Sequence, residues 1–299
     1  MPARPSEIHY LPDTADFARR VARKAGLPAR AVATRRFPDR ESLVQVAAPV
    51  ARSVVLTAQL HDPDPKLIRV LLAADALRRN GAERVRLLVP YLPYMRQDAA
   101  FEPGQAVAQR VFTRTLGRSF DEIITLEPHL HRARSLTFGG RCRARTLSAA
   151  PVLAEWCRRR RGRVVLVGPD EESRRWVRAV ARRASFAFVV GRKIRLGDRR
   201  VRIEFPETVQ ADRAILLDDI ASSGATLAAA ARALHRRGID HVEAAVVHAI
   251  FAPGASRRIR AAGIERIASC DTVPHVSNAI RTAGIFGPAV LARGGARRG

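Results

Sequence analysis

The stretch that decides the fold runs from residue 216 to residue 227 and reads Leu216-Leu217-Asp218-Asp219-Ile220-Ala221-Ser222-Ser223-Gly224-Ala225-Thr226-Leu227. The apolar residues 214–217 predict a buried strand, and the alanine-rich residues 226–236 predict a helix. Small residues between them let the backbone close around an anion, and the first N–H groups of the helix supply donors. The sequence therefore predicts a phosphate-binding turn between a strand and a helix.

Two adjacent carboxylates, Asp218 and Asp219, directly follow the predicted strand. Open α/β sheets bind their ligands at the carboxyl ends of the strands. A phosphate on one side and two carboxylates on the other suit a sugar phosphate, because carboxylates accept hydrogen bonds from vicinal hydroxyl groups. Taken alone, the same residues also fit an ordinary Asp-containing turn capped by serine.

Short strand-like runs recur along the chain, at residues 85–89, 123–126, 164–167, 186–190 and 242–247. Segments with helical periodicity alternate with them. This pattern predicts an α/β fold with two similar domains, each a mainly parallel sheet flanked by helices. The polar, glycine-containing segment 139–148 marks the expected boundary, which gives an N-terminal domain over residues 1–145 and a C-terminal domain over 146–299.

The composition agrees with an ordinary globular protein. At 299 residues, 47% of them hydrophobic, the chain has room for two domains with cores of their own. We expect a cytoplasmic location and no membrane partner, because neither a signal peptide nor a membrane span is recognisable. The cysteines are Cys142, Cys157 and Cys270, which lack the close spacing of a zinc or redox motif.

The net charge of +25 raises the question of nucleic acid. The basic residues are spread over the whole chain, and only 5% of the residues are aromatic, so no stacking platform for single strands is predicted. We expect no specific nucleic-acid partner. Of the 53 basic residues only Lys24, Lys66 and Lys193 are lysine, so each lysine stands out against an arginine background.

Residues 218–226 resemble the ribose-phosphate loop of the type I phosphoribosyltransferase fold, in which two acidic residues precede a Ser/Thr-Gly-rich turn. Ala225 stands where a second glycine is common. The resemblance implies that ribose 5-phosphate is bound by Asp218, Asp219, Ser222, Ser223, Gly224, Ala225 and Thr226.

Other segments narrow the resemblance to the ribose-phosphate pyrophosphokinase family. Residues 36–41, Arg-Phe-Pro-Asp-Arg-Glu, resemble its adenine-binding loop, and residues 90–98 resemble its second ATP segment. The ATP-binding residues implied in this way are Phe37, Asp39, Glu41, Arg96 and Gln97. In the family the first three reach in from a neighbouring subunit, which implies self-association into a dimer or a larger assembly.

The resemblance also implies a magnesium site and a catalytic arm. His129, after Glu127-Pro128, resembles a histidine that helps to hold Mg–ATP, and Asp170 resembles a magnesium-linked aspartate. Lys193 and Arg195 fall where the family has its catalytic lysine and arginine, with His129 as a third catalytic residue. A lysine suits this position because its compact charge on a flexible stem can follow a phosphoryl group.

The implied reaction is Mg²⁺-dependent transfer of the β,γ-diphosphate of ATP to the C1 hydroxyl of ribose 5-phosphate. Three departures from the family pattern stand out. Arg40 replaces a usual glycine, and Glu127 replaces a usual aspartate. Residues 171–173, Glu-Glu-Ser, replace a small glycine-bearing turn beside Asp170. Two alternatives therefore stay open, a catalytically weak or silent regulatory paralogue and a phosphoribosyltransferase.

Overall fold

Both halves of the chain fold around a six-stranded sheet. The computed structural model describes residues 6–130, 135–195, 201–205 and 210–292, without the side chains of Lys193, Arg195 and Val201. The chain divides into two compact units, Met1–Leu147 with Ala283–Gly299, and Ser148–Thr282. The sequence prediction placed every residue after 145 in the second domain, whereas the described residues 283–292 are grouped with the first unit.

The sheet of the first unit has the strand order β2-β1-β5-β6-β7-β8, and each neighbouring pair is parallel. Its strands are β1 (Glu7–Tyr10), β2 (Ala29–Ala31), β5 (Ser53–Thr57), β6 (Arg84–Leu88), β7 (Glu122–Leu126) and β8 (Arg143–Leu147). The central strands are largely buried, as expected for a parallel sheet covered on both faces, and the buried charges of Arg86 in β6 and Glu122 in β7 are paired with each other.

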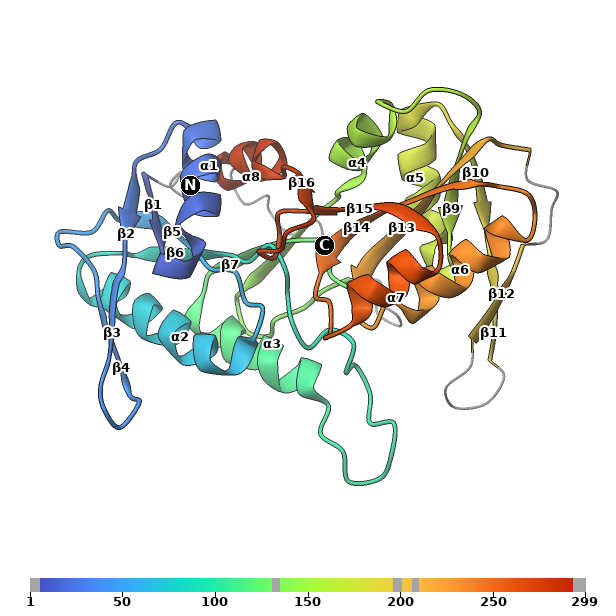
Figure 1. Ribbon diagram of the computed structural model, residues 1–299. Helices are drawn as coiled ribbons and strands as arrows, with labels where there is room; N and C mark the ends of the chain where they lie inside the picture. The colour runs from blue at the N-terminus through green and yellow to red at the C-terminus, as the bar shows by residue number, and fades with distance from the viewer. Residues whose placement is uncertain (1–5, 131–134, 196–200, 206–209, 293–299) are drawn as a thin grey trace. The chain divides into compact units, whose positions relative to one another are not determined.

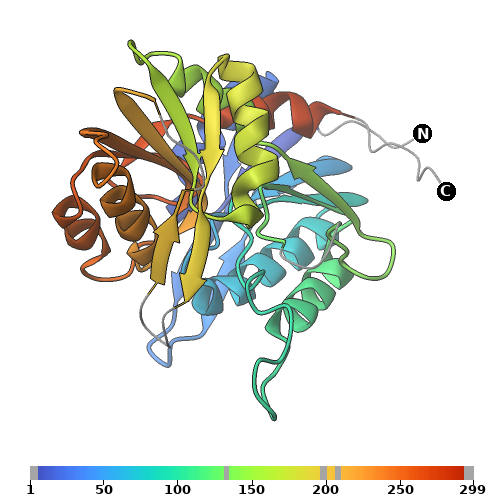
Figure 2. The same ribbon diagram turned by 90° about the vertical axis from the view of Figure 1, so that its right-hand side faces the viewer.

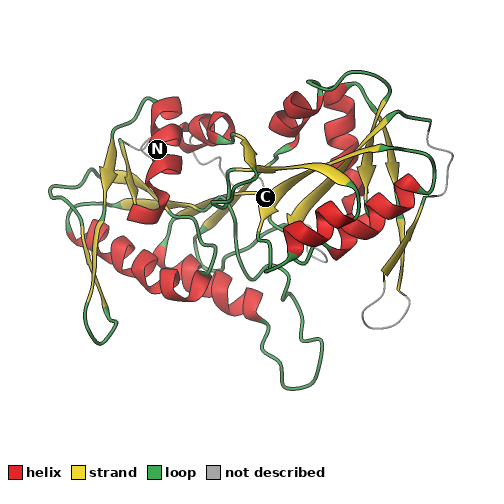
Figure 3. Cartoon of the chain, viewed as in Figure 1, coloured by secondary structure: helices red, strands yellow, loops and turns green. Residues whose placement is uncertain are grey.

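Helices cover both faces of this sheet, as Figures 1 and 3 show. They are the short 3₁₀ turn η1 (Pro12–Thr14) and the α-helices α1 (Ala15–Ala25), α2 (Pro63–Arg79), α3 (Ala108–Ser119) and α8 (Ala283–Leu291). Helices α1 and α8 lie together, with the rings of Phe17 and Phe286 edge to face at 5.5 Å. A separate antiparallel hairpin, β3 (Ala33–Arg36) and β4 (Ser42–Gln45), projects from the unit.

The sheet of the second unit has the order β10-β9-β13-β14-β15-β16, again with parallel pairing throughout. Its strands are β9 (Val164–Gly168), β10 (Ala187–Val190), β13 (Arg213–Ala221), β14 (His241–Ala249), β15 (Ile264–Cys270) and β16 (Asn278–Ile280). Its helices are α4 (Ala150–Cys157), η2 (Glu171–Ser173), α5 (Arg174–Ala184), α6 (Ala225–His235) and α7 (Ala255–Ala261). A hairpin of β11 (Arg192–Arg195) and β12 (Val201–Glu204) extends beyond this sheet (Figure 2).

The two sheets share one topology. Strands β2-β1-β5-β6-β7-β8 of the first correspond in order to β10-β9-β13-β14-β15-β16 of the second. The expected fold, two similar α/β domains with parallel sheets, is therefore confirmed. Parallel strands of one sheet end at the same edge, so each unit gathers the loops that follow its strands at a single carboxyl edge.

Strand β13 is longer than the sequence indicated. The apolar run predicted an end at Leu217, but the strand continues through the carboxylates to Ala221. Its neighbour β14 is equally long, and the pairing runs on through Asp218 opposite Val246 to Ala221 opposite Ala249. No helix in the described part of the chain is both long and apolar enough to cross a membrane.

Candidate active site

The turn between β13 and α6 has the geometry that the sequence predicts for an anion site. Gly224 precedes the helix with a φ of 72°, a conformation that favours glycine. A Cβ atom there would also lie 2.7 Å from the Ile259 Cγ1 atom and 3.3 Å from the Ala255 carbonyl oxygen. Glycine therefore lets the turn approach α7 closely at the start of α6.

The carbonyl oxygens of the turn accept hydrogen bonds from residues that the sequence analysis did not identify. The Arg258 side chain of α7 donates from Nη1 to the Ser223 carbonyl at 2.7 Å. The Ala252 N–H donates to the Ser222 carbonyl at 3.2 Å. Both bonds use acceptors of the turn and none of its N–H donors, which is what an anion-binding turn requires. Arg258 gave no signal in the sequence because arginine is common everywhere in this chain.

Three carboxylates lie close to one another beside this turn. Asp218 and Asp219 belong to β13, and Asp170 follows β9, the strand paired with β13 in parallel. Burial, the adjacent Asp219 carboxylate and the Asp170 carboxylate together hold the pKa of Asp218 well above its usual range. The carboxyl edge of the second sheet is thus a concentrated negative site next to an anion-binding turn.

The unusual segment after Asp170 forms an ordered turn. Asp170 caps η2, with its Oδ1 atom accepting from the Ser173 N–H at 3.3 Å and its carbonyl accepting from the Ser173 hydroxyl at 2.5 Å. Glu171 is exposed and bound to Arg174 through two hydrogen bonds of 2.5 and 2.6 Å, which lower the pKa of its carboxyl. The charge of Glu171 is therefore compensated outside the site.

The β11–β12 hairpin begins next to the Asp170 loop. At Gly191, directly before β11, a Cβ atom would lie 2.5 Å from the Ile203 Cγ2 atom and 2.9 Å from the Pro169 carbonyl oxygen. This close approach ties the start of the hairpin to the segment that carries Asp170. Lys193 and Arg195 have their backbone in β11, but their side chains lie outside the described part of the structure.

The first unit gathers three of the predicted nucleotide residues at its carboxyl edge. Arg96 and Gln97 lie in the loop after β6 and are exposed, and His129 lies in the loop after β7 and is half-buried. Strands β6 and β7 are parallel neighbours, so the two loops leave the same edge of the sheet.

The loop that carries Arg96 is fixed by Tyr94. The Tyr94 ring packs at 5.2 Å from the ring of Phe112, and its hydroxyl donates to the Asp64 carboxylate. This bond raises the pKa of Tyr94 to about 12. Tyr94 thus has a packing role, and the exposed Arg96 and Gln97 that follow it are presented by an anchored segment.

The remaining ATP candidates lie on the β3–β4 hairpin. Phe37 donates its N–H to the Glu41 carbonyl at 2.9 Å, and the Glu41 N–H donates to the Asp39 carboxylate at 3.1 Å. Asp39 and Glu41 are exposed at the tip.

Known protein families match both units. The model of the N-terminal domain of ribose phosphate pyrophosphokinase matches residues 7–119, and that of the phosphoribosyl transferase domain matches residues 146–278. A ribose-phosphate pyrophosphokinase from Methanopyrus kandleri is 35% identical over 263 residues, which cover 87% of this chain and 89% of that protein. Ribose-phosphate pyrophosphokinase 2 of Archaeoglobus fulgidus is 32% identical over 269 residues, 89% of this chain and 93% of the relative. The chain belongs to the ribose-phosphate pyrophosphokinase family.

A solved structure shows the same fold at lower identity. The phosphoribosylpyrophosphate synthetase from Mycobacterium smegmatis matches with a TM-score of 0.80 and covers 95% of this chain and 97% of its own, at 20% sequence identity. The family resemblance inferred from the sequence is thereby confirmed. The individual roles assigned to residues of this pyrophosphokinase-family chain stay predictions.

The described residues do not form a preformed metal-binding site made of protein ligands alone. No group of three or more His, Cys, Asp or Glu side chains among them is placed to hold a metal ion. Magnesium fits this finding, because it is commonly bound through one or two carboxylates together with water and substrate phosphates. The mutual repulsion of Asp170, Asp218 and Asp219 also favours a cation nearby.

Proposed function

We propose that this protein is a ribose-phosphate diphosphokinase that transfers the β,γ-diphosphate of ATP to ribose 5-phosphate and releases AMP and phosphoribosyl pyrophosphate. The observation that carries the proposal is the glycine-dependent turn 222–226 beside the paired carboxylates of β13. Membership of the pyrophosphokinase family supports the same reaction.

The second unit binds the sugar phosphate in this proposal. The 5-phosphate lies on the N–H groups at the start of α6, with Ser222, Ser223 and Thr226 as hydroxyl donors. Asp218 and Asp219 accept hydrogen bonds from the ribose hydroxyls. Holding both ends of the ribose fixes the C1 hydroxyl for in-line attack, and this positioning is a main source of rate for such a reaction.

The chemical step exchanges one phosphorus–oxygen bond for another. The C1 hydroxyl oxygen forms a bond to the β-phosphorus of ATP, and the bond from that phosphorus to the bridging oxygen of the α-phosphate breaks. The bridging oxygen leaves with AMP, and the hydroxyl proton is released. Lys193 and Arg195, on a hairpin anchored at Gly191, stabilise the charge on the transferring diphosphate.

Magnesium belongs to the same proposal. Asp170 would hold the ion together with oxygen atoms of the substrates, and His129 would contribute on the nucleotide side. When bound, Mg²⁺ neutralises phosphate charge. It would also offset the repulsion that raises the pKa of Asp218.

The ATP site is proposed to need two subunits. Arg96 and Gln97 contact ATP from one subunit, while Phe37, Asp39 and Glu41 reach it from the projecting hairpin of a neighbour. The exposure of Asp39 and Glu41 at the hairpin tip supports this role. Self-association into a dimer or a larger assembly, and a cytoplasmic location, are parts of this proposal.

Observations in both units weigh against the two alternatives. A phosphoribosyltransferase does not need an ATP-binding first unit, whereas residues 7–119 match the N-terminal domain of the pyrophosphokinase. A silent paralogue was suggested by the extra carboxylates after Asp170. Glu171, however, is paired with Arg174 and exposed.

The reaction can be tested with purified protein, Mg²⁺, ribose 5-phosphate and ATP labelled in its β-phosphate. We expect AMP to form and the label to appear in the sugar product. Label transfer separates diphosphate transfer from simple ATP hydrolysis. The proposal fails if no AMP forms above background across several divalent metals and with phosphate present.

Lys193→Ala tests the role of the hairpin. We expect turnover to fall about a hundredfold or more, which is roughly 2.7 kcal/mol of lost transition-state stabilisation. Lys24→Ala, at an exposed lysine of α1, is the matched control and is expected to keep wild-type turnover. Equal turnover of the two variants in a steady-state assay of AMP release would remove Lys193 from the catalytic machinery.

A further inference from the structure

No proposed catalytic or binding role involves Lys66, a buried lysine of the first unit. It is one of only three lysines among the 53 basic residues, and its side chain is 9% exposed. A buried ammonium lowers stability unless polar groups surround it, so its environment should show what it does. Lys66 lies in the first turn of α2, which follows the loop after β5 at the carboxyl edge of the first sheet.

Three acceptor residues converge on the Lys66 ammonium. Its Nζ atom donates to the Gln59 carbonyl at 3.2 Å and lies 3.2 Å from the Asp13 carboxylate. The two ring nitrogens of His61 lie 3.2 and 3.0 Å from the same atom. Burial and the Lys66 charge lower the pKa of His61, so the ring stays neutral and has one nitrogen that accepts. Lys66 therefore joins the loop after β1 to the loop after β5.

This arrangement accounts for a lysine where the chain otherwise uses arginine. An ammonium is a compact charge with three donors that point in different directions. A guanidinium is planar and suits acceptors that lie side by side. Acceptors from three separate residues around one nitrogen match the ammonium, so arginine is not expected to replace Lys66.

The first turn of α2 lacks the usual means of fixing the start of a helix. Among the described residues, Asp62 at the N-cap makes no side-chain capping bond, and its φ of 51° is left-handed. Pro63 and Pro65 have no N–H group to donate. The contacts of Lys66 with the loops after β1 and β5 hold the turn in place of a cap.

The same turn holds the loop that carries Arg96 and Gln97. Asp64, two residues before Lys66, accepts a hydrogen bond from the Tyr94 hydroxyl. Tyr94 has a φ of 65°, a left-handed conformation that is unfavourable for a tyrosine. Its carbonyl accepts from the Gln97 N–H at 3.1 Å. The conformation of Tyr94 therefore sets the turn from which Arg96 and Gln97 project.

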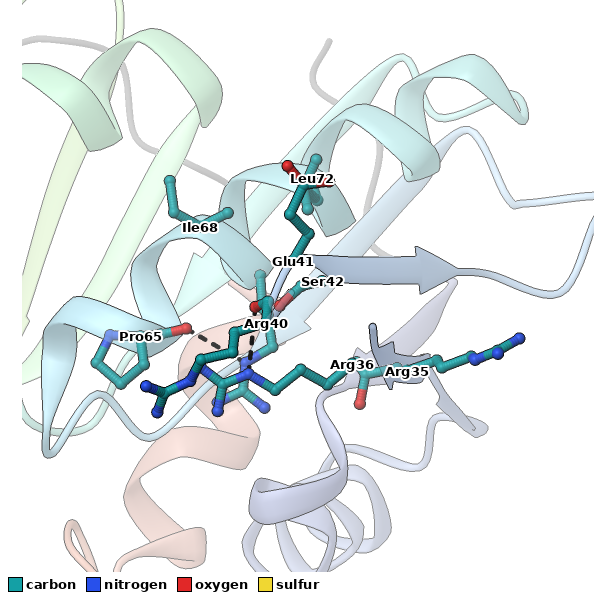
Figure 4. Close-up of a pocket in the computed structure, with 10 residues that line it drawn as sticks. Arg35, Arg36, Arg40, Glu41, Ser42, Pro65, Ile68 and Leu72 are labelled. Atoms are coloured by element: carbon teal, nitrogen blue, oxygen red, sulfur yellow. Dashed lines mark hydrogen bonds between the residues drawn. The ribbon is translucent and has the colours of Figure 1, made fainter. Parts of the chain in front are cut away.

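A different face of α2 is turned to the β3–β4 hairpin. The pocket beside the hairpin is lined by side chains of both elements, among them Pro65, Ile68, Arg69, Arg36 and Arg40 (Figure 4). Asp64 and Lys66 are not among the described residues that line it. The two side chains thus serve the loops of the carboxyl edge and not the hairpin.

We propose that Lys66, through the three contacts of its ammonium, is a positioning residue for nucleotide binding. It fixes the first turn of α2, and the turn presents the Asp64 carboxylate to Tyr94, which holds the ATP-binding loop 94–97. The inference rests on the proposed ATP site. Without Lys66 the loop is less ordered before ATP binds, so part of the binding free energy is spent on ordering it.

Calorimetric titration of the full-length protein with Mg–ATP tests this role without relying on turnover. Lys66→Met keeps an unbranched side chain and removes the charge, and we expect it to raise the Kd for Mg–ATP about three- to tenfold. Its Kd for ribose 5-phosphate should stay at the wild-type value, because that site is assigned to the second unit. Lys24→Met, at an exposed lysine of α1, is the matched control and should keep both affinities.

Lys66→Arg keeps the charge and serves as the second variant where Lys66→Met fails to fold. We expect the same loss of Mg–ATP affinity, because a guanidinium does not place its donors on all three acceptors.

Tyr94→Phe tests the next step and leaves the buried lysine in place. It keeps the ring that packs on Phe112 and removes only the hydroxyl, so the Kd for Mg–ATP should again rise about three- to tenfold. Combined with Lys66→Arg, the two losses should not add, because both break one series of contacts. Tyr10→Phe is the control, since it removes a hydroxyl that accepts from Arg19 at 3.1 Å elsewhere in the first unit.

The opposite results are equally clear. Wild-type affinity for Mg–ATP in Lys66→Arg or in Tyr94→Phe would overturn the proposal. Additive losses in the double variant would do the same, and so would an equal loss of ribose 5-phosphate affinity, which would indicate an effect on the whole fold. The proposed reaction would stand in each case, because it depends on the label-transfer assay.

Discussion

At the scale of single residues, Asp218 occupies an environment that lowers the stability of the folded protein but suits the binding of a sugar. Burial of its carboxyl and the nearby carboxylates of Asp219 and Asp170 all disfavour its charged form. A sugar-phosphate site needs acceptors for hydroxyl groups, and ionised carboxylates are good acceptors. The fold therefore favours the protonated form of Asp218, whereas binding of the sugar hydroxyls favours the ionised form.

Asp218→Asn is expected to stabilise the protein and to disable it. Because the folded state raises the pKa of Asp218, the folded protein keeps a proton that the unfolded chain has lost, and stability falls as pH rises through that window. Compared with the wild type, the variant should therefore have a higher Tm at pH 7 to 8, and its Tm should change less with pH above about 4. It should also bind ribose 5-phosphate more weakly. Thermal unfolding across pH and titration with the sugar phosphate measure both effects.

Asp240→Asn, at an exposed carboxylate after α6, is the control for that experiment. We expect its curve of Tm against pH to follow that of the wild type. A lower Tm for Asp218→Asn at every pH would show that the carboxylate is stabilising in the folded state, contrary to this account.

At the scale of elements, the β11–β12 hairpin depends on one close approach. Gly191 lies against Ile203 of β12 and against the carbonyl of Pro169, so the hairpin and the Asp170 loop are positioned together. A side chain at this point would push the two segments apart. The position of the hairpin is thus set by packing at its base.

Gly191→Ala should destabilise the second unit by roughly 1–3 kcal/mol, as overpacking does, and should lower kcat because the segment of Lys193 and Arg195 moves. Gly284→Ala is the matched control, since a Cβ atom in that helical position of α8 meets nothing within 4 Å. We expect the control to match or slightly exceed the wild-type Tm. Wild-type Tm and kcat for Gly191→Ala would contradict the packing argument.

At the scale of the whole molecule, the chain crosses twice between its two units. Helix α8 comes last in the sequence and belongs to the first unit, where Phe286 is fully buried against Phe17 of α1. Arg145 of β8 also donates to the Ala289 carbonyl of α8. The stability of the first unit therefore depends on residues that follow the complete second unit.

Phe286→Ala should cost about 3–5 kcal/mol, the scale for removing a buried aromatic ring. Hydrogen exchange should show the loss of protection in α1 and the first sheet, with peptides from residues 148–282 unchanged. Val276→Ala, at a side chain that is 97% exposed, should leave both units as they are. Loss of protection confined to the second unit would refute the assignment of α8.

The sequence by itself determined the strands, the helices and the anion-binding turn, which depend on residues close together in the chain. The alternation of apolar runs and helical periods predicts the two parallel sheets, because both patterns arise from local geometry. The small residues from Ser222 to Thr226 predict the anion-binding turn in the same way. Family motifs then indicate which reaction such a turn serves.

Only the tertiary structure decided what residues distant in sequence do together. It brought Arg258 behind the turn, extended β13 to Ala221 along an equally long neighbour, and returned α8 to the first unit. It also joined Arg36 and Arg69 in one pocket. Such contacts depend on strand register and packing between segments far apart in the chain, and residue patterns within a segment carry no information about either.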